Sequence, residues 1–329
     1  MFNVSKKILQ AAVIGCGIPA ILLILLIALL PPKNQNVDPT DTKKETQSTG
    51  DFAEQKKVNI PVLIDGQIQQ IDMETYVIRV VLAEMPASFD MEALKAQAVA
   101  SRTYALRTCA DGNKHDGAVC TNYQCCQAYM TEEAYLQRGW SNRYVQRVRE
   151  AVYMTAGQVL TYEGEWIRAT YFSCSGGCTE AAVAVWGKEY PYLQSVKSPG
   201  EEETVYFTDT KCFTLDEFQE AMGIALSGTA DTWFGQITYT DGGGVETMVI
   251  GGIPYRGTTL RSLLGLRSTV FETIVTETEI TFLTKGYGHR VGMSQYGAEA
   301  MAIDGYDFTE ILRYYYRDIE IEDNYGNIT

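Results

Sequence analysis

The sequence predicts an α+β protein, with mixed helices and short, mostly antiparallel strands following an N-terminal transmembrane helix. Three observations lead to this fold class. An uncharged run extends from Ile8 to Pro32, two helical patterns follow each other between residues 72 and 107, and short strand patterns dominate from about residue 150. Because the later helices do not alternate regularly with strands, the pattern favours α+β over a parallel α/β architecture.

The composition limits both size and partners. A chain of 329 residues with 46% hydrophobic and 21% charged residues can form one large globular domain or two moderate ones. Its net charge of −14 argues against a nucleic-acid partner, because phosphate binding needs a concentrated basic face.

Residues 1–32 are expected to form a cytoplasmic tip and a membrane anchor. The uncharged run is long enough to span a bilayer, and Lys6 and Lys7 before it favour a cytoplasmic N-terminus. A cleaved signal peptide is the alternative, although no small-residue cleavage site follows the run. Residues 33–57 are polar and predict a flexible stalk, which leaves 58–329 as the extracytoplasmic domain.

The domain is predicted to begin with a hairpin and two helices. Residues 58–73 contain two strand patterns around Asp65-Gly66, a strong hairpin-turn signal. The first helix is expected to start after Asp72, which can cap it, and to end before Pro86. A second helix, rich in alanine, is expected to start near Asp90.

Beyond residue 150 the expected elements are short. Strand patterns occur in "GQVLTYEGEWIRATYFS", "TWFGQITYT", "VETMVIGGIPYRG" and "FETIVTETEITFLTKG", and short helical patterns in "TLDEFQEAMG", "TLRSLLG" and "DFTEILRYYY".

Glu84 stands near the end of the first predicted helix, on the same stripe as Met73, Val77 and Val80. Apolar surroundings penalise a charged carboxylate, so we expect a raised pKa and a proton retained near neutral pH. Such an acid can protonate a leaving group. The structural alternative is a polar helix end that frays into solvent or pairs with an arginine such as Arg102.

A cysteine-rich insertion occupies residues 109–126. Four cysteines and His115 fall among turn-forming residues, a density that fits zinc ligation by thiolate and imidazole. Disulfides are the alternative in an extracytoplasmic domain. A serine hydrolase is disfavoured, because no nucleophile elbow accompanies the other histidine, His289.

Four stretches together resemble the stage II sporulation protein D family, which is related to amidase-enhancer proteins of bacterial cell walls. They are "AEMPASFDMEALKAQAVASRTYAL", "YFSCSGGCTE" leading to "VWGKEYPYLQSV", "GTTLRSLLGLRS" and "KGYGHRVGMSQYGA". The resemblance spans about residues 58 to 320. It implies a lytic transglycosylase that cleaves the MurNAc-GlcNAc bond of peptide-free peptidoglycan strands in a substrate groove and leaves 1,6-anhydro-MurNAc ends, with Glu84 as catalytic acid.

The resemblance also implies where sugar binds. We expect Arg102 on the second helix to hydrogen-bond sugar rather than to pair with Glu84, since pairing would lower the acid's pKa. The chain departs from the family at Arg290, where the family usually has glycine. The other expected groove residues come from the glycine-rich stretches and the segment between them: Ser173, Ser175, Tyr192, Tyr287, His289 and Gln295.

Relatives of this type bind zinc through one histidine and two cysteines, which map onto His115, Cys120 and Cys126. Cys125 is expected to fit less well, because adjacent side chains point apart. Cys109, Cys174, Cys178 and Cys212 stay unassigned between disulfides and free thiols.

The resemblance further implies a place of action and partners. The place is the engulfing mother-cell membrane of a spore-forming bacterium, and the partners are an amidase and a membrane scaffold protein. Two other functions remain open: a non-catalytic wall-binding enhancer of an amidase, and a zinc hydrolase.

Overall fold

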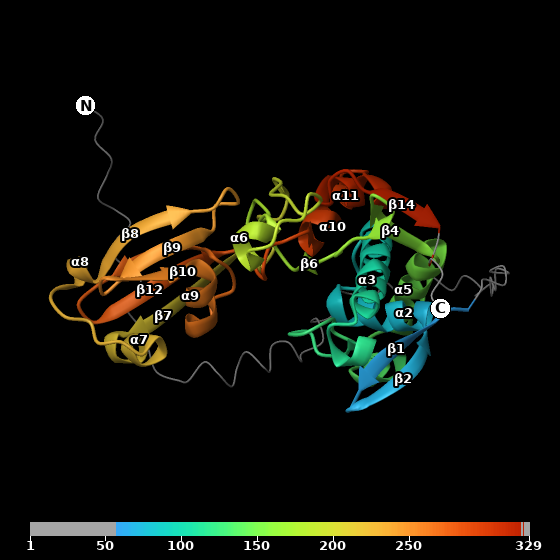
Figure 1. Cartoon of the computed structure of the whole chain (residues 1–329), viewed down its shortest axis with the longest axis horizontal. Coiled ribbons are helices and arrows are strands. Elements are labelled where there is room, and N and C mark those ends of the chain that lie inside the picture. Colours follow the sequence, from blue (N-terminus) through green and yellow to red (C-terminus); the bar gives the residue numbers. More distant parts are fainter. Residues whose placement is uncertain (1–56, 324, 326–329) are drawn as a thin grey trace, which may run out of the picture.

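The computed structural model describes residues 57–323 and 325. They form two lobes, each around its own apolar core (Figure 1). The predicted anchor and nearly all of the predicted stalk lie outside the described residues. Within the described part, no helix combines the length and apolarity that crossing a membrane requires.

The predicted hairpin opens the first lobe. β1 (Asn59–Ile64) pairs antiparallel with β2 (Gln67–Asp72), and the turn residues Asp65 and Gly66 both have positive φ, as this turn requires. β1 also pairs in parallel with β3 (Val119–Cys120), which attaches the cysteine-rich insertion to the sheet. The hairpin prediction is confirmed.

Both predicted helices are present with the expected caps. α2 (Met73–Glu84) begins where the Asp72 side chain accepts a hydrogen bond from a first-turn amide, and it ends before the proline. α3 (Met91–Asp111) begins in the same way at Asp90. The two helices run antiparallel because only a short bend joins them.

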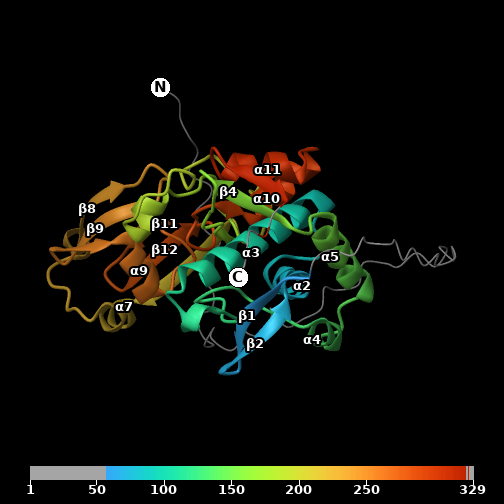
Figure 2. The same cartoon turned by 45° about the vertical axis from the view of Figure 1, so that its right-hand side comes forward.

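α3 is the central helix of the first lobe (Figure 2). It packs against α2 and α5 (Asn142–Met154), and also against α10 (Gln295–Ile303) and α11 (Phe308–Tyr315). Small side chains let these neighbours approach closely. The alanines fully buried along α3 are Ala93, Ala96, Ala98, Ala100 and Ala105.

Shorter elements complete this lobe. β14 pairs antiparallel with β4, which pairs antiparallel with β5, while β13 pairs in parallel with β6 and so joins two distant segments of the chain. The shorter elements of this lobe, with their bounds, are η1 (His115–Gly117), α4 (Glu132–Gln137), β4 (Gln158–Tyr162), β5 (Glu165–Trp166), β6 (Tyr171–Phe172), α6 (Ala182–Trp186), β13 (Met293–Ser294) and β14 (Glu320–Asp323).

The second lobe contains two three-stranded antiparallel sheets around a core rich in phenylalanine. One has the order β11-β12-β7 and the other β10-β9-β8. Its elements are β7 (Thr208–Thr214), α7 (Leu215–Met222), α8 (Ala230–Trp233), β8 (Phe234–Tyr239), β9 (Val245–Ile250), β10 (Ile253–Arg256), α9 (Gly257–Leu264), β11 (Val270–Val275) and β12 (Glu279–Lys285). The mixed architecture with small antiparallel sheets agrees with the predicted α+β class.

Arg290 connects the two lobes. It is fully buried, and its guanidinium donates to the carbonyl oxygens of Ser175 (2.7 Å), Cys178 (2.6 Å) and Gly242 (2.7 Å) and pairs with Glu180 at 3.2 Å. Its φ of 65° lies in the left-handed region, where a glycine is ordinarily favoured. These contacts stabilise a conformation that is otherwise unfavourable for an arginine.

Arg102 and Glu74 form a buried ion pair between α3 and α2. Arg102 Nη2 lies 2.5 Å from Glu74 Oε2, and its Nε donates to Oε1 at 3.1 Å. The guanidinium also donates to backbone oxygens of Gln158 and Val152, so the buried charge is well satisfied.

Arg102→Met is expected to lower the free energy of unfolding by about 3–5 kcal/mol, because it leaves the Glu74 carboxylate buried without its counter-charge. Urea denaturation of the two proteins measures the difference. Arg143→Met, on the exposed face of α5, is the matched control and should change the free energy by less than about 0.5 kcal/mol. Equal stabilities for the two variants would contradict this role.

Candidate active site

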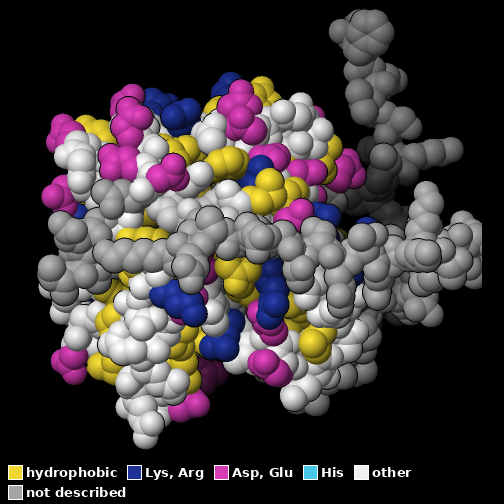
Figure 3. All heavy atoms as spheres, turned by 90° about the vertical axis from the view of Figure 1, so that its right-hand side faces the viewer, with side chains coloured by type: hydrophobic (Ala, Val, Ile, Leu, Met, Phe, Trp, Pro, Cys, Tyr) yellow, Lys and Arg dark blue, Asp and Glu magenta, His cyan; other side chains and the backbone are white. Residues whose placement is uncertain are grey.

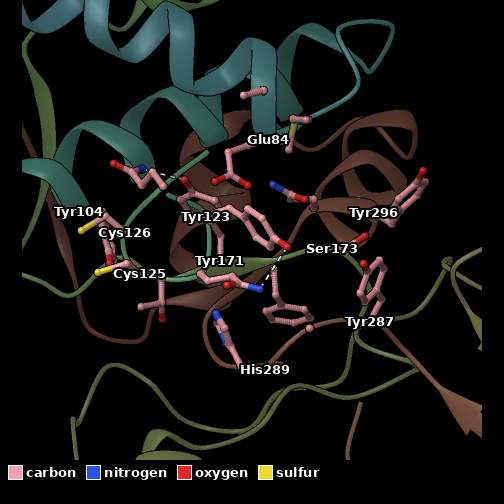
Figure 4. Close-up of a pocket in the computed structure, with 18 of the residues that line it drawn as sticks. Glu84, Tyr104, Tyr123, Cys125, Cys126, Tyr171, Ser173, Tyr287, His289 and Tyr296 are labelled. Atoms are coloured by element: carbon pink, nitrogen blue, oxygen red, sulfur yellow. Dashed lines mark hydrogen bonds between the residues drawn. The ribbon is translucent and has the colours of Figure 1, made fainter. Parts of the chain in front are cut away.

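A groove of about 1610 Å³ lies where the first lobe meets α9 of the second. Its lining comes from the end of α2, from α3, the cysteine-rich insertion and β6, and from the segment before β13. Figure 4 shows Glu84 between the Tyr104 and Cys125 side of the groove and the Tyr287 and Tyr296 side. This position puts the carboxyl group within reach of a long ligand.

Glu84 is half-buried at the last turn of α2, and its Oε1 accepts a hydrogen bond from the backbone N–H of Ala128 at 2.6 Å. Burial raises the pKa of this carboxyl, while the hydrogen bonds from Ala128 and the Tyr171 hydroxyl oppose that rise. The net shift is upward, in the direction expected from the sequence.

Tyr171 is a site residue that the sequence analysis did not identify. Its hydroxyl accepts from Gln127 Nε2 at 2.7 Å, and Gln127 Oε1 accepts from the Tyr76 hydroxyl at 2.9 Å. The chain of hydrogen bonds fixes Tyr171 beside Glu84. The only signal in the sequence was its position two residues before Ser173, within a stretch already singled out.

Tyr171→Phe is expected to raise the pKa of Glu84 further, because it removes a hydrogen bond that favours the charged form. A ¹³C NMR titration of the Glu84 carboxyl carbon measures the shift. Tyr135→Phe, at a groove tyrosine outside this network, serves as control. An unchanged or lowered pKa in Tyr171→Phe would contradict the hydrogen bond.

Aromatic side chains dominate the groove. Among the described residues that line it, Glu84 is the single carboxylate and five are lysine or arginine. Flat rings of this kind suit the apolar faces of sugar rings, and their hydroxyl groups suit the sugar edges. The aromatic residues are Tyr104, Tyr123, Tyr135, Trp140, Tyr144, Tyr171, Phe172, Trp186, Tyr190, Tyr206, Tyr287 and Tyr296.

Four of the expected groove residues line this groove: Ser173, Tyr287, His289 and Gln295. The His289 ring lies against Phe172 and Trp186, and its Nδ1 accepts from the Val291 N–H at 3.1 Å. Burial lowers the pKa of His289 to about 4, so the ring is neutral at neutral pH and Nε2 carries its hydrogen. Its one N–H faces the backbone carbonyl of Tyr171, and the neutral ring is not a second acid.

Three expected sugar contacts are wrong. Arg102 is fully buried in its ion pair with Glu74 and lies outside the groove lining. Ser175 is fully buried and donates to Glu201. Tyr192 is buried, and its hydroxyl accepts from the backbone N–H of Arg168. Each side chain is already occupied by protein groups.

Glu201 instead organises the glycine-rich turn. Its Oε2 accepts from Ser175 N (2.6 Å), Ser175 Oγ (2.9 Å) and Cys174 Sγ (3.0 Å). The turn packs backbone to backbone against the later glycine-rich segment: a Cβ on Gly176 would lie 2.8 Å from Gly286 N, and both glycines have positive φ. This packing places Ser173 and Tyr287 on the same groove wall.

His115, Cys120, Cys125 and Cys126 form a cluster beside the groove, with their four ligand atoms all within 4.8 Å of one another. His115 Nε2 lies 3.3 Å from Cys125 Sγ. The expectation that the side chains of Cys125 and Cys126 point apart is wrong, because both thiols lie in this cluster. Amides of both cysteines donate to Asn122 O (2.9 and 2.8 Å), and this tight turn brings both thiols to one side.

The cysteines in the described part of the chain, Cys109, Cys174, Cys178 and Cys212 included, form no disulfide. Cys174 Sγ donates to Glu201, and Cys178 Sγ lies 3.2 Å from Ser195 Oγ. Of the two alternatives, disulfides or free thiols, these four cysteines are free thiols in this structure.

The fold and the groove define the class of protein: a two-lobed α+β protein with an aromatic groove around one half-buried acid. Comparisons with known proteins identify its family. A family model described as "Stage II sporulation protein" matches residues 65–162. Stage II sporulation protein D of Bacillus amyloliquefaciens is 40% identical over 291 residues, covering 86% of this chain and 84% of the relative. The chain belongs to the stage II sporulation protein D family, as its motifs indicated.

Two further relatives place the family in context. Stage II sporulation protein D of Bacillus subtilis (strain 168) is 38% identical over 322 residues, covering 92% of this chain and 93% of the relative. An amidase enhancer of the same organism is 31% identical over 289 residues, covering 71% of this chain and 38% of the enhancer. The chain is thus also related to a protein named for enhancing an amidase.

Proposed function

We propose that this protein is a lytic transglycosylase that cuts the MurNAc-GlcNAc bond of peptide-free peptidoglycan strands. The observation that supports this most is the single half-buried carboxyl of Glu84, whose pKa is raised, in a wide aromatic groove. Among the described residues that line the groove there is no second carboxyl group. Hydrolases of glycosides ordinarily use two carboxyl groups, one of them to activate water or attack the sugar. An intramolecular attack needs only one.

In the proposed reaction, protonated Glu84 donates its proton to the bridging oxygen as the bond from that oxygen to C1 of MurNAc breaks. The O6 of the same MurNAc then bonds to C1, and the Glu84 carboxylate takes the proton from O6. The products are a GlcNAc 4-hydroxyl end and a 1,6-anhydro-MurNAc end, and Glu84 is protonated again. The Ala128 N–H and Tyr171 hold the carboxyl group in place.

We also propose that the cluster of His115, Cys120, Cys125 and Cys126 holds a zinc ion. One imidazole and three thiolates are a ligand set of structural zinc sites, and the ligand atoms are close enough together to share one ion. Zinc supplies a cross-link for a segment with little regular structure. Ala128 follows Cys126 by two residues, so the cross-link would also fix the position of the Ala128 N–H that donates to Glu84.

The proposed setting follows the family. Residues 1–32 anchor the protein in the mother-cell membrane with the domain outside, and the protein acts during engulfment with an amidase and a membrane scaffold protein. An enhancer of an amidase is the second candidate, because of the related amidase enhancer.

Incubation of the full-length protein with peptide-free strands, followed by mass spectrometry, tests the proposal. Anhydro-MurNAc ends formed without any added enzyme support a lytic transglycosylase. Their absence, together with faster amide hydrolysis when an amidase is added to strands that still carry their peptides, supports the enhancer. Products with reducing MurNAc ends that disappear on chelation indicate a zinc hydrolase instead.

A further inference from the structure

The groove differs in charge from the rest of the chain. The whole chain has a net charge of −14, yet the described groove lining has five lysines and arginines and one carboxylate. On the described part of the face in Figure 3, by contrast, acidic and basic side chains are interspersed. A concentration of positive charge in one groove indicates an anionic ligand.

Three of the cations define what we call the basic arm: Arg107, Arg168 and Lys188. Two of them lie over one aromatic ring. The Arg168 guanidinium carbon lies 5.8 Å and Lys188 Nζ 5.1 Å from the ring centroid of Tyr190. Arg107 and Arg168 both contact Asp111. The arm therefore combines a ring that can stack on sugar with donors for an anion.

The protein neutralises this arm only in part. Asp111 is shared by both arginines, and Glu165, 3.7 Å from Arg107, is largely exposed. Lys188 has no carboxylate within 4.0 Å among the described residues, and Arg168 Nε is buried there without a hydrogen-bond partner. Positive charge is left over beside the groove.

The arm lies on the side of Glu84 that carries the cysteine-rich insertion. Arg168 precedes Tyr171 by three residues on one segment. Burial raises the pKa of Tyr104, and the positive charge of Arg168 is close enough to that hydroxyl group to oppose the rise. Figure 4 shows Tyr104 beside Cys126. Tyr287 and Tyr296 lie on the other side of Glu84 (Figure 4). A strand that crosses Glu84 thus meets the basic arm on one side and Tyr287 and Tyr296 on the other.

The chemistry of the proposed substrate supplies one anion at each MurNAc. The peptide is joined to the lactyl group of MurNAc by an amide, and hydrolysis of that amide frees a carboxylate. Arginine binds a carboxylate through two parallel hydrogen bonds, and lysine adds a point charge. An amide at the same place offers neither the charge nor the second oxygen acceptor.

We propose that the basic arm binds the free lactyl carboxylate of a MurNAc residue and so makes the groove selective for strands from which peptides have been removed. This inference rests on the proposed function. It assigns the selectivity to charge recognition at Arg107, Arg168 and Lys188, and it requires an amide-hydrolysing enzyme to act on the strand first.

Binding to the full-length chain with Glu84→Gln, which prevents turnover, tests the proposal by calorimetry. The ligands are peptide-free strands, the same strands with lactyl methylamides, and GlcNAc oligomers of equal length. Introducing Lys188→Glu as a second substitution in this chain is expected to weaken binding of peptide-free strands about 10-fold or more. The affinities for the two uncharged ligands should change by less than about twofold. The matched control is Lys197→Glu, an exposed lysine outside the groove.

Salt gives a second measurement, because added NaCl should weaken binding of peptide-free strands and leave GlcNAc oligomers nearly unaffected. The inference is overturned if the Glu84→Gln protein that keeps Lys188 binds carboxylate and methylamide strands with equal affinity. It is also overturned if Lys188→Glu weakens the binding of all three ligands equally. These readouts are of binding alone. If strands bind selectively but the wild-type chain forms no anhydro ends, the proposed reaction fails while the basic arm stands.

Discussion

Glu84→Gln is expected to reduce the formation of anhydro-MurNAc ends by about 10²–10⁴-fold, the usual contribution of a general acid. Glutamine keeps the size and the acceptor that faces the Ala128 N–H, but its amide cannot hand a proton to the leaving oxygen. The fold and the binding of strands should be retained. Mass spectrometry of the products and calorimetric binding measure the two effects separately.

Glu299→Gln is the matched control for this variant. Glu299 is also half-buried, also accepts a backbone N–H, from Asp90 at 2.6 Å, and also has a pKa raised by burial. It lies outside the groove lining, so its substitution should leave activity within about twofold. Anhydro products at the wild-type rate from Glu84→Gln would refute the assignment of the acid.

The same residue determines the pH dependence. Because Glu84 must start protonated, kcat/KM should fall as pH rises through its pKa. The raised pKa places that fall at higher pH than for an ordinary glutamate, whose pKa is near 4.5. A pH profile without this loss on the alkaline side would argue against an acid in this role.

Removal of the proposed zinc ion is expected to lower activity by about 10²-fold, the cost of a displacement of roughly 1 Å at a catalytic group. The ion does not touch the sugar in our proposal. It holds the segment that presents the Ala128 N–H to Glu84. Dialysis against a chelator, metal analysis and re-addition of zinc measure loss and recovery on the same sample, with glycan-strand cleavage as readout.

Ligand variants separate a metal effect from a general effect of the chelator. Cys125→Ser and Cys126→Ser should both reduce the bound zinc and the cleavage activity, while Cys212→Ser, at an exposed thiol in β7, should change neither. Full zinc content in Cys125→Ser would limit the ligands to the other three. Unchanged cleavage after complete metal removal would contradict the link from the cluster to Glu84.

Much of the local structure could be predicted because short-range chemistry determines it. The hairpin depends on a turn that only residues tolerant of positive φ can form, and α2 and α3 begin at aspartates that cap them. Glu84 could be singled out because it continues an apolar stripe. The density of cysteines around His115 indicated a metal site, and the resemblance supplied Cys120 and Cys126. The place of Cys125 in the cluster depended on a tight turn.

Arg102 shows where spacing alone misled the prediction. α2 and α3 are antiparallel about the bend near Ser88, and Arg102 is as far after Ser88 as Glu74 is before it. The arginine therefore reaches the start of α2 and not its end, where Glu84 lies. The prediction for Ser175 was wrong for a different reason. Its hydroxyl donates to Glu201, which lies twenty-six residues away in the chain.

The amino-acid sequence was sufficient for the opening hairpin, the starts of α2 and α3 and the helix that carries the acid, since caps, turns and apolar periodicity act over a few residues. It did not predict α4, α5 or α10. Only the packed protein decided which side chains share the groove. Tyr171, Ala128 and the basic arm come from separate segments, and whether a side chain faces ligand, core or another charge depends on which segments fold against it.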